Sequence, residues 1–181
     1  KIAIVGHNGA GKTTLIKLLM RFYQVNNGNI LINNDNIDDL KIDTYYRNVG
    51  MLSQDFGSYS ELTAEDNIIL GDPTKVVCKT DITSAAKKAD AHKFISDYPK
   101  KYDQLLSESF NGGIRPSTGQ WQKIAISRLF YRNPWLVIFD EPTASIDAEA
   151  EYKIFNNIYK FFKNKTVIII SHRFSTVRNA D

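Results

Sequence analysis

The stretch Gly6-His7-Asn8-Gly9-Ala10-Gly11-Lys12-Thr13 decides the fold class of this chain. It follows the apolar run Ile2–Val5 and precedes an amphipathic segment from Thr14 to Phe22, so it predicts a buried strand, a glycine-rich turn and a helix. The first amides of that helix have no partner within it, and together with the positive end of the helix dipole they form a cradle for phosphate oxygens. The flanking strand and helix make this short motif specific. The chain is therefore predicted to bind a nucleoside polyphosphate.

Individual residues of this loop have separable roles. Glycine at positions 9 and 11 allows backbone angles and a close approach that a side chain would block. Lys12 supplies a mobile positive charge for the terminal phosphates, and Thr13 supplies a hydroxyl for Mg²⁺. The alternative is a tight strand-to-helix turn with an incidental lysine, and it is disfavoured because the strand and the helix that confirm the phosphate-binding motif are both predicted.

Length and composition indicate one globular domain. The chain has 181 residues, of which 43% are hydrophobic and 24% charged, and this balance argues against disorder. A net charge of +3 is too small to indicate a nucleic-acid surface. The single cysteine, Cys78, excludes an internal disulfide and fits a reducing compartment. No apolar run approaches the ~18 residues of a membrane-spanning helix. Since Lys1 lies inside the first predicted strand, we expect a fragment of a longer polypeptide.

The remaining sequence predicts an α/β core that is interrupted by helices. Continuous β-branched runs suit central strands of a parallel sheet, and the segment from about Thr63 to Arg132 has helical spacing instead. The strands predicted after the first helix are Gly28–Asp35, Val49–Ser53, Leu136–Phe139 and Thr166–Ile170. A helix from Glu149 to Phe162 joins the last two strands and completes a strand-helix-strand unit.

Two adjacent carboxylates, Asp140 and Glu141, follow the apolar run Leu136–Phe139. Because neighbouring side chains on an extended strand point to opposite sides, the two acids are suited to different tasks. Asp140 can hold the Mg²⁺ that bridges the phosphates, and Glu141 can orient and deprotonate the attacking water. Two acids at the end of a core strand need a cation partner, which favours this interpretation over turn carboxylates ahead of Pro142.

Two more polar side chains follow predicted strands. His172 comes just after Thr166–Ile170, and Gln54 comes just after Val49–Ser53. Since ligands bind beyond the carboxyl ends of strands in open α/β sheets, His172 could contact the terminal phosphate and fix the position of the water. Gln54 could coordinate Mg²⁺ or hold the water, although a plain surface glutamine fits the sequence equally well.

A second helix start is predicted at Ser117-Thr118-Gly119-Gln120, and its helix continues to Tyr131. Ser117 and Gln120 have the spacing of a capping box, in which each side chain satisfies a free amide. The same helix N-terminus also offers amides to an anion, and the two interpretations are compatible.

These motifs, in this order, resemble the nucleotide-binding domain of an ATP-binding-cassette transporter, and the resemblance covers nearly the whole chain. Gly6–Thr13 matches the family's phosphate loop, Gln54 its Q-loop, and Ser117–Gln120 its signature. Asp140 matches its magnesium aspartate and Glu141 its catalytic glutamate. Ser145–Asp147 resembles its D-loop, and His172 its switch histidine. The tail from Ser171 to Val177 is similar to the exporter branch, in which the ATPase is usually fused behind a membrane domain.

The resemblance implies a P-loop NTPase (RecA-like) fold, α/β with a mostly parallel sheet core and an inserted α-helical subdomain. The implied division places the first part of the core at residues 1–55, the helical subdomain with the signature at 56–133, and the second part of the core at 134–181. The implied function is ATP hydrolysis that powers export of a substrate, at the cytoplasmic face of the cell membrane.

The implied ligands are ATP and Mg²⁺, and the implied partners are a transmembrane domain and a second nucleotide-binding domain, identical or different. Two such domains pair head to tail and sandwich two ATP molecules. The residues implied to bind ATP are Gly6, Asn8, Gly9, Ala10, Gly11, Lys12, Thr13 and Thr14, with Ser117, Gly119 and Gln120 from the opposite domain. The implied catalytic residues are Glu141, His172 and Gln54, and the implied Mg²⁺ ligands are Thr13, Gln54 and Asp140.

The chain departs from the family at the signature. The usual Leu-Ser-Gly-Gly-Gln is here Pro116-Ser117-Thr118-Gly119-Gln120, so a stiff proline precedes the helix and a branched side chain replaces a glycine. Because Glu141 and His172 are present, we hypothesise an asymmetric exporter with one impaired site. The aromatic residue that stacks on adenine in the family would precede Lys1.

Other interpretations compete with export. A regulatory module that binds nucleotide without hydrolysis fits the altered signature, but Glu141 and His172 oppose it. A DNA-repair type of ATPase is disfavoured because no heptad run separates Lys12 from Ser117 and no basic stripe is present. A GTPase is disfavoured because the sequence contains no Asn-Lys-x-Asp.

Overall fold

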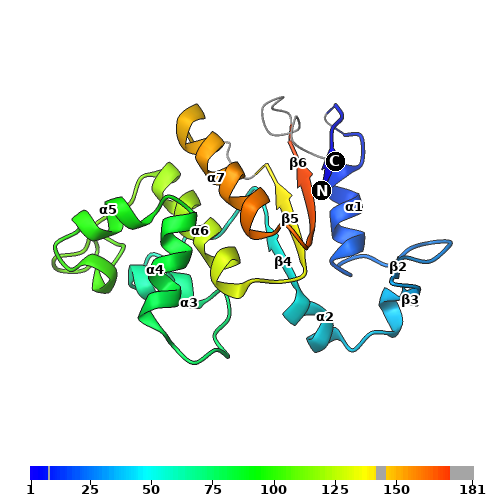
Figure 1. Cartoon of the computed structure of the whole chain (residues 1–181), viewed down its shortest axis with the longest axis horizontal. Coiled ribbons are helices and arrows are strands. Elements are labelled where there is room, and N and C mark those ends of the chain that lie inside the picture. Colours follow the sequence, from blue (N-terminus) through cyan, green and yellow to red (C-terminus); the bar gives the residue numbers. More distant parts are fainter. Residues whose placement is uncertain (8, 142–145, 172–181) are drawn as a thin grey trace.

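The computed structural model describes residues 1–7, 9–141 and 146–171. Its centre is a parallel sheet with the strand order β1-β6-β5-β4 (Figure 1). These strands are β1 (Ile2–Ile4), β4 (Val49–Leu52), β5 (Leu136–Asp140) and β6 (Thr166–Ile170). The predicted mixed α/β class with a parallel core is confirmed.

Alternation along the two central strands divides the core into two layers. Val137 and Phe139 of β5 belong to one hydrophobic cluster, and Ile138 belongs to the other. The Ile138 face is covered by α1 (Lys12–Leu19) and α2 (Ile42–Asn48), whose buried side chains join the same cluster. The Phe139 face is covered by α6 (Thr118–Arg132) and α7 (Ala148–Phe161). The helices α1 and α6 therefore lie on opposite faces of the sheet (Figure 1).

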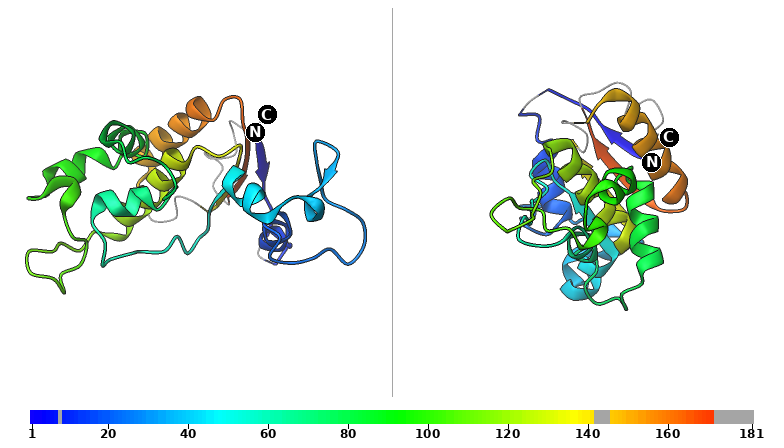
Figure 2. Two further views of the ribbon diagram at one scale, coloured as in Figure 1. Left: turned by 90° about the horizontal axis from the view of Figure 1, so that it is seen from below. Right: turned by 90° about the vertical axis from the view of Figure 1, so that its left-hand side faces the viewer.

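The helical segment extends away from the sheet on the side of α6 (Figure 2). Its other helices are α3 (Ala64–Ile69), α4 (Lys79–Lys88) and α5 (His92–Asp97), followed by the short 3₁₀ helix η2 (Lys101–Asp103). Their buried side chains share one hydrophobic cluster with α6 and with one face of the sheet. The α6 helix ends at Asn133, which adopts the left-handed conformation ahead of Pro134.

One predicted strand is wrong in detail. The segment Gly28–Asp35 was expected to be a single strand, but it contains β2 (Leu31–Ile32) and leads into β3 (Asp35–Asn36), which pair as an antiparallel hairpin. Asn33 and Asn34 form the turn with φ angles of 51° and 72°. Asparagine tolerates this left-handed conformation, so the chain reverses where a continuous strand was predicted. The 3₁₀ helix η1 (Ile37–Asp39) follows the hairpin.

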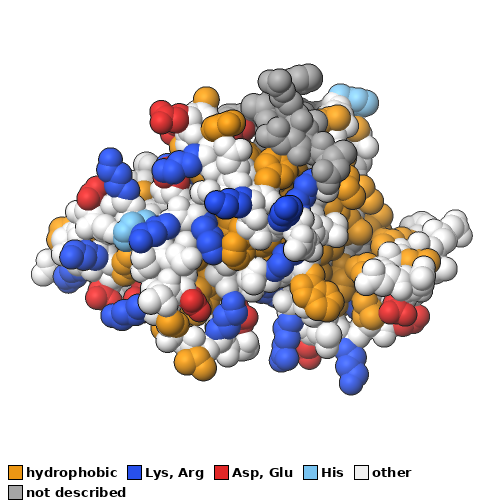
Figure 3. Space-filling view, in the orientation of Figure 1, with side chains coloured by type: hydrophobic (Ala, Val, Ile, Leu, Met, Phe, Trp, Pro, Cys, Tyr) orange, Lys and Arg blue, Asp and Glu red, His pale blue; other side chains and the backbone are white. Residues whose placement is uncertain are grey.

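The surface bears mixed charge. Basic and acidic side chains both lie on the face shown in Figure 3, and basic side chains predominate across its middle. Within the described ranges, no helix combines the length and apolar character needed to cross a bilayer.

Candidate nucleotide-binding site

The register of the sheet brings the predicted motifs to one edge. Ile4 and Asp140 both lie opposite Ile170, and Leu52 lies opposite Phe139, so the carboxyl ends of the four strands are level. The phosphate loop follows β1, Gln54 follows β4, and Glu141 follows β5. Three predicted positions, Asn8, Ser145 and His172, lie outside the described residues.

The phosphate loop has the backbone that its glycines allow. Gly9 and Gly11 have φ angles of 83° and 86°, a left-handed conformation that other residues adopt only with strain. The amide of Ala10 donates to the carbonyl of His7 at 3.2 Å, which closes the turn. Gly11 is the N-cap of α1, so this helix begins at Lys12, two residues earlier than the predicted start at Thr14.

Lys12 places a cation inside this turn. Its ammonium donates to the carbonyl oxygens of Gly6 at 2.8 Å and His7 at 3.0 Å, and the side chain is half-buried. Thr13 and Thr14 are exposed in the first turn of α1, where free amides point outward. Together the amides, the ammonium and the helix dipole favour an anion with several oxygens.

Asp140 is the buried acid of the site, with only 8% of its surface exposed. Alternation on β5 puts it on the same face as Ile138, which is the face that α1 covers. Burial raises the pKa of Asp140, the neighbouring Glu141 raises it further, and Lys12 opposes both effects. This carboxylate therefore lacks sufficient positive charge around it, as expected of a ligand for a cation.

These residues fit a Mg²⁺ ion whose remaining ligands are phosphate oxygens and water. In the part of the chain that the structure describes, no three His, Cys, Asp or Glu side chains gather into a metal site. Asp140 and Thr13 are oxygen donors of the kind that Mg²⁺ prefers, and Mg²⁺ commonly keeps waters and substrate phosphates as its other ligands.

Glu141 differs from the prediction in its backbone. Both acids are predicted to lie on an extended strand, but β5 ends at Asp140, and Glu141 has a φ of 50°. Its amide still donates to the carbonyl of Ile170 at 3.0 Å. A left-handed non-glycine residue costs about 1–3 kcal/mol, and such strain concentrates at functional sites.

Gln54 is exposed and makes no hydrogen bond with the described residues. The backbone just after it is firmly held by Arg128 of α6. The guanidinium donates to the carbonyls of Phe56 and Gly57, both at 2.9 Å, and to Asn67 of α3. Arg128 is not predictable as part of the site, because no local sequence pattern indicates its contacts with residues 56, 57 and 67.

The capping box at the start of α6 is confirmed. The amide of Gln120 donates to Oγ of Ser117 at 3.3 Å, and Oε1 of Gln120 accepts from the amide of Ser117 at 2.9 Å. Pro116 is buried, whereas Thr118 is exposed as the first residue of the helix. A hollow of about 860 Å³ lies beside this helix start, lined in part by Ser107, Arg115 and Thr118.

The structure does not bring the signature to the phosphate loop of the same chain. Ser117, Gly119 and Gln120 begin α6, which covers one face of the sheet, while Lys12 begins α1 on the other. The predicted nucleotide-binding residues thus form two separate groups within one chain.

Comparison with known proteins assigns this arrangement to a family. The family model described as ABC transporter matches residues 1–144. The chain belongs to the ABC transporter family. Its sequence is 39% identical over 180 residues to YgaD of Bacillus subtilis (strain 168), which is named as a multidrug export ATP-binding/permease protein, and equally to a protein of the same description from Staphylococcus aureus (strain Mu50). The alignments cover 99% of this chain and 30% of each relative.

A solved structure supports the same assignment. The bacterial Atm1-family ABC exporter with ATP bound superposes with a TM-score of 0.90 and 32% identity, over 99% of this chain and 31% of the exporter chain. The predicted P-loop NTPase fold is confirmed. This ABC transporter chain is an ATP-binding domain of the exporter type, and ATP hydrolysis is the activity of its family. It spans about a third of the length of the relatives that it matches.

Proposed function

We propose that this domain binds ATP with Mg²⁺ and hydrolyses it to power export across a membrane, at the cytoplasmic face. The observation that carries the proposal is the convergence of the phosphate loop, the cation of Lys12 and the buried Asp140 at one edge of the sheet. We also propose the division into core and helical parts at residues 1–55, 56–133 and 134–181.

Each residue of the chain has a distinct task in this proposal. The amides from Gly9 to Thr13 and the ammonium of Lys12 bind the triphosphate, with Asn8 and Thr14 beside them. Thr13, Asp140 and Gln54 would hold Mg²⁺, which when bound neutralises charge on the phosphate oxygens. Glu141 accepts a proton from the attacking water, and His172 steadies the terminal phosphate.

The second group of residues supports a head-to-tail pair. Because α6 and α1 cover opposite faces of the sheet, Ser117 and Gly119 cannot close over the nucleotide of their own chain without dismantling the core between them. In a pair of domains they would close over the nucleotide on the other one, and the free amides at the start of α6 would face its terminal phosphate.

A groove next to Gln54 is the proposed docking site for the membrane domain. It has a volume of about 540 Å³ and lies between the end of α1, β4 and α6, with Phe22, Leu70 and Arg128 among its lining residues. Phe22 and Leu70 expose large apolar surfaces there. The relatives are named ATP-binding/permease proteins, and two thirds of their length lies outside the match. A cytoplasmic segment of that membrane part is the proposed occupant, because the groove contacts the backbone that Arg128 ties to α6.

Replacing Glu141 by glutamine tests the hydrolytic assignment. Glu141→Gln should retain ATP binding, because the cradle does not depend on this side chain. Turnover should fall about 10²- to 10⁴-fold, or roughly 3–5 kcal/mol in the barrier. ATP binding by fluorescence titration and phosphate release would be measured on the same preparations. A variant that hydrolyses ATP at the normal rate would exclude Glu141 as the general base.

A second candidate function is a pair with one impaired site, which the exposed branched side chain of Thr118 favours. Steady-state turnover of the domain paired with itself would be compared with that of Thr118→Gly. The impaired-site proposal predicts slow, non-cooperative turnover that the glycine variant accelerates. Normal cooperative hydrolysis by the unaltered pair would contradict it.

A further inference from the structure

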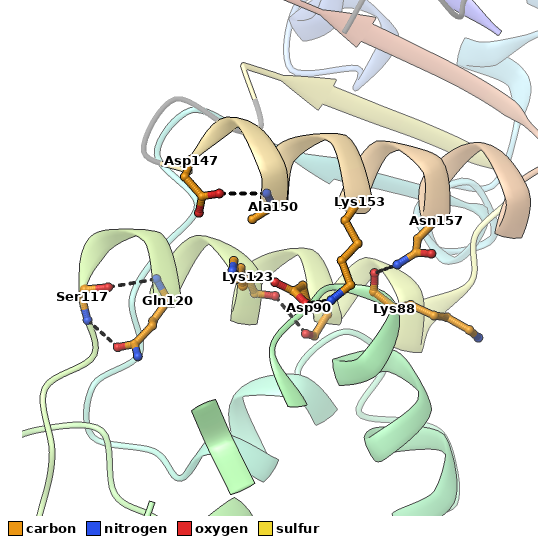
Figure 4. Close-up of polar contacts among 10 residues, drawn as sticks. Lys88, Asp90, Ser117, Gln120, Lys123, Asp147, Ala150, Lys153 and Asn157 are labelled. Atoms are coloured by element: carbon orange, nitrogen blue, oxygen red, sulfur yellow. Dashed lines mark hydrogen bonds and ion pairs between the residues drawn. The ribbon is translucent and has the colours of Figure 1, made fainter. Parts of the chain in front are cut away.

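Asp90 joins three helices through one carboxylate. It occupies the turn between α4 and α5 with a φ of 59°. Its Oδ2 lies 2.9 Å from Nζ of Lys123 on α6, and its Oδ1 accepts a hydrogen bond from Nζ of Lys153 on α7 (Figure 4). We call these three residues the Asp90 cluster.

The cluster is partly shielded from water. The side chains of Lys123 and Asp90 are only 16% and 21% exposed, whereas Lys153 is 61% exposed. Burial alone would raise the pKa of Asp90, but the hydrogen bonds from Lys153 and Lys123 outweigh it and lower the pKa. Asp90 is therefore ionised at neutral pH. Without its charge, two lysine ammonium groups would face each other with no anion between them.

A second contact makes the same connection between α4 and α7. Nδ2 of Asn157 donates to the carbonyl of Lys88 at 2.7 Å, and the ammonium of Lys88 lies 3.7 Å from the ring centre of Phe161. The end of α4 is thus attached along α7, and the Asp90 cluster adds α6 to this attachment (Figure 4).

The two lysines of the cluster lie equally far from the N-termini of α6 and α7, and the two helices begin at the same end. Lys123 lies six residues after Ser117, the N-cap of α6, and Lys153 lies six residues after Asp147, the N-cap of α7. Six residues correspond to about 9 Å along a helix axis. Figure 4 shows both N-caps at the same end, with Asp90 between the two helices farther along. A shift of α6 along α7 would break one of the two ion pairs.

We propose that Asp90 is a positioning residue that fixes the start of α6 relative to the start of α7, and through it the place where this domain meets the nucleotide of its partner domain. The inference rests on the proposed head-to-tail pair. The inference predicts different effects at the two nucleotide sites of the pair. Loss of the Asp90 charge should impair the nucleotide site to which this chain contributes its signature, and spare the site to which it contributes its phosphate loop.

The test uses the full-length transporter with only one hydrolytic site active. Asp90→Asn is placed in this chain, since asparagine keeps the shape and tolerates the left-handed conformation. In one preparation Glu141→Gln is added to the same chain, so the partner's phosphate loop is the active site. In the other, the corresponding glutamate of the partner is changed instead. Each is compared with the same preparation without Asp90→Asn, by kcat and KM for ATP.

We expect the Asp90→Asn change to lower kcat about two- to thirtyfold in the first preparation and to leave the second near its reference rate. Equal losses in both preparations, or a loss in neither, would overturn the inference. Asp97→Asn, an exposed acid at the end of α5, is the charge-matched control and should change neither rate.

A second variant and the reference preparations cover the cases in which Asp90→Asn alone would give no answer. If Asp90→Asn fails to fold, the more exposed Lys153→Met replaces it in the same design, with the same expected asymmetry. If both reference preparations, which carry only a glutamate change, retain full turnover, the proposed function fails. Failure of the Asp90 inference looks different: the references lose turnover as expected, but Asp90→Asn changes kcat equally in both preparations or in neither.

Discussion

Asp140 is the residue whose surroundings most favour the proposed charged ligand. It lies at the end of a core strand, buried beside a second acid, with Lys12 as the cation that opposes the repulsion. Ordinary core packing would favour a neutral side chain here. The raised pKa indicates that the domain without its ligand bears a cost for this charge, which a bound cation would remove.

This cost predicts a dependence of stability on pH. Because the pKa of Asp140 is raised, the unfolded chain loses this proton first as the pH rises from about 4, so the carboxylate destabilises the native state above that range. Asp140→Asn should therefore unfold at higher urea concentration at pH 7.5, and its advantage should shrink toward pH 4. Addition of Mg²⁺ and ATP should stabilise the unaltered domain more than the variant, because the variant keeps the triphosphate cradle but lacks the carboxylate proposed to hold Mg²⁺.

Asp147 provides a control of the opposite sign. The hydrogen bond from the amide of Ala150 lowers the pKa of Asp147, so its ionised form favours the native state and this contribution is lost as the pH falls. Asp147→Asn should gain no stability at pH 7.5. A lower urea midpoint for Asp140→Asn than for the unaltered domain at this pH would contradict the account of Asp140.

At the scale of secondary structure elements, two helices begin with the same capping device. Ser117 and Gln120 form a capping box at α6, and Thr63 and Asp66 form one at α3. Only the first lies at the signature. The pair therefore separates the effect of a lost cap on stability from an effect on nucleotide turnover.

Ser117→Ala and Thr63→Ala should each lower the free energy of unfolding by about 1 kcal/mol, because each removes the N-cap oxygen. Only Ser117→Ala should also lower ATP turnover in the paired state, since Ser117 is proposed to close over the partner's nucleotide. Urea midpoints and phosphate release would be measured for both variants. Equal losses of turnover would indicate that Ser117 acts only through stability.

The sequence predicted these elements where the signals were local. Unbroken apolar runs located β5 and β6, and the spacing of Ser117 and Gln120 predicted the cap of α6. The hairpin at Asn33–Asn34 was missed because asparagine is less diagnostic of a left-handed turn than glycine. The convergence of the motifs at one edge was predictable from the parallel direction of the strands, because their carboxyl ends then lie at the same edge of the sheet.

Features that depend on distant contacts could not be predicted in the same way. The left-handed backbone of Glu141 follows from how the chain leaves β5, which no sequence pattern around Asp140 records. Arg128 and Asp90 look like ordinary surface charges in the sequence, and their roles depend on carbonyls and lysines from other elements. Propensity and periodicity describe neighbours in sequence, whereas these contacts form only when helices pack.

At the scale of the whole molecule, the fold keeps the two groups of proposed nucleotide-binding residues apart. The sheet separates α1 from α6, so one chain presents a phosphate cradle on one side and a signature on the other. Each half of the proposed nucleotide site is built on the start of a helix, and the Asp90 cluster links the signature helix to α7. Under the proposed function, a complete site requires a second domain.

The most direct measurement is the structure of the full-length transporter carrying Glu141→Gln, determined with ATP and Mg²⁺. The account predicts a triphosphate on the amides from Gly9 to Thr13, within reach of Lys12 and Asp140, and covered by Ser117 of the partner subunit. A loop that stays empty at saturating ATP, or a triphosphate bound away from Lys12, would contradict it.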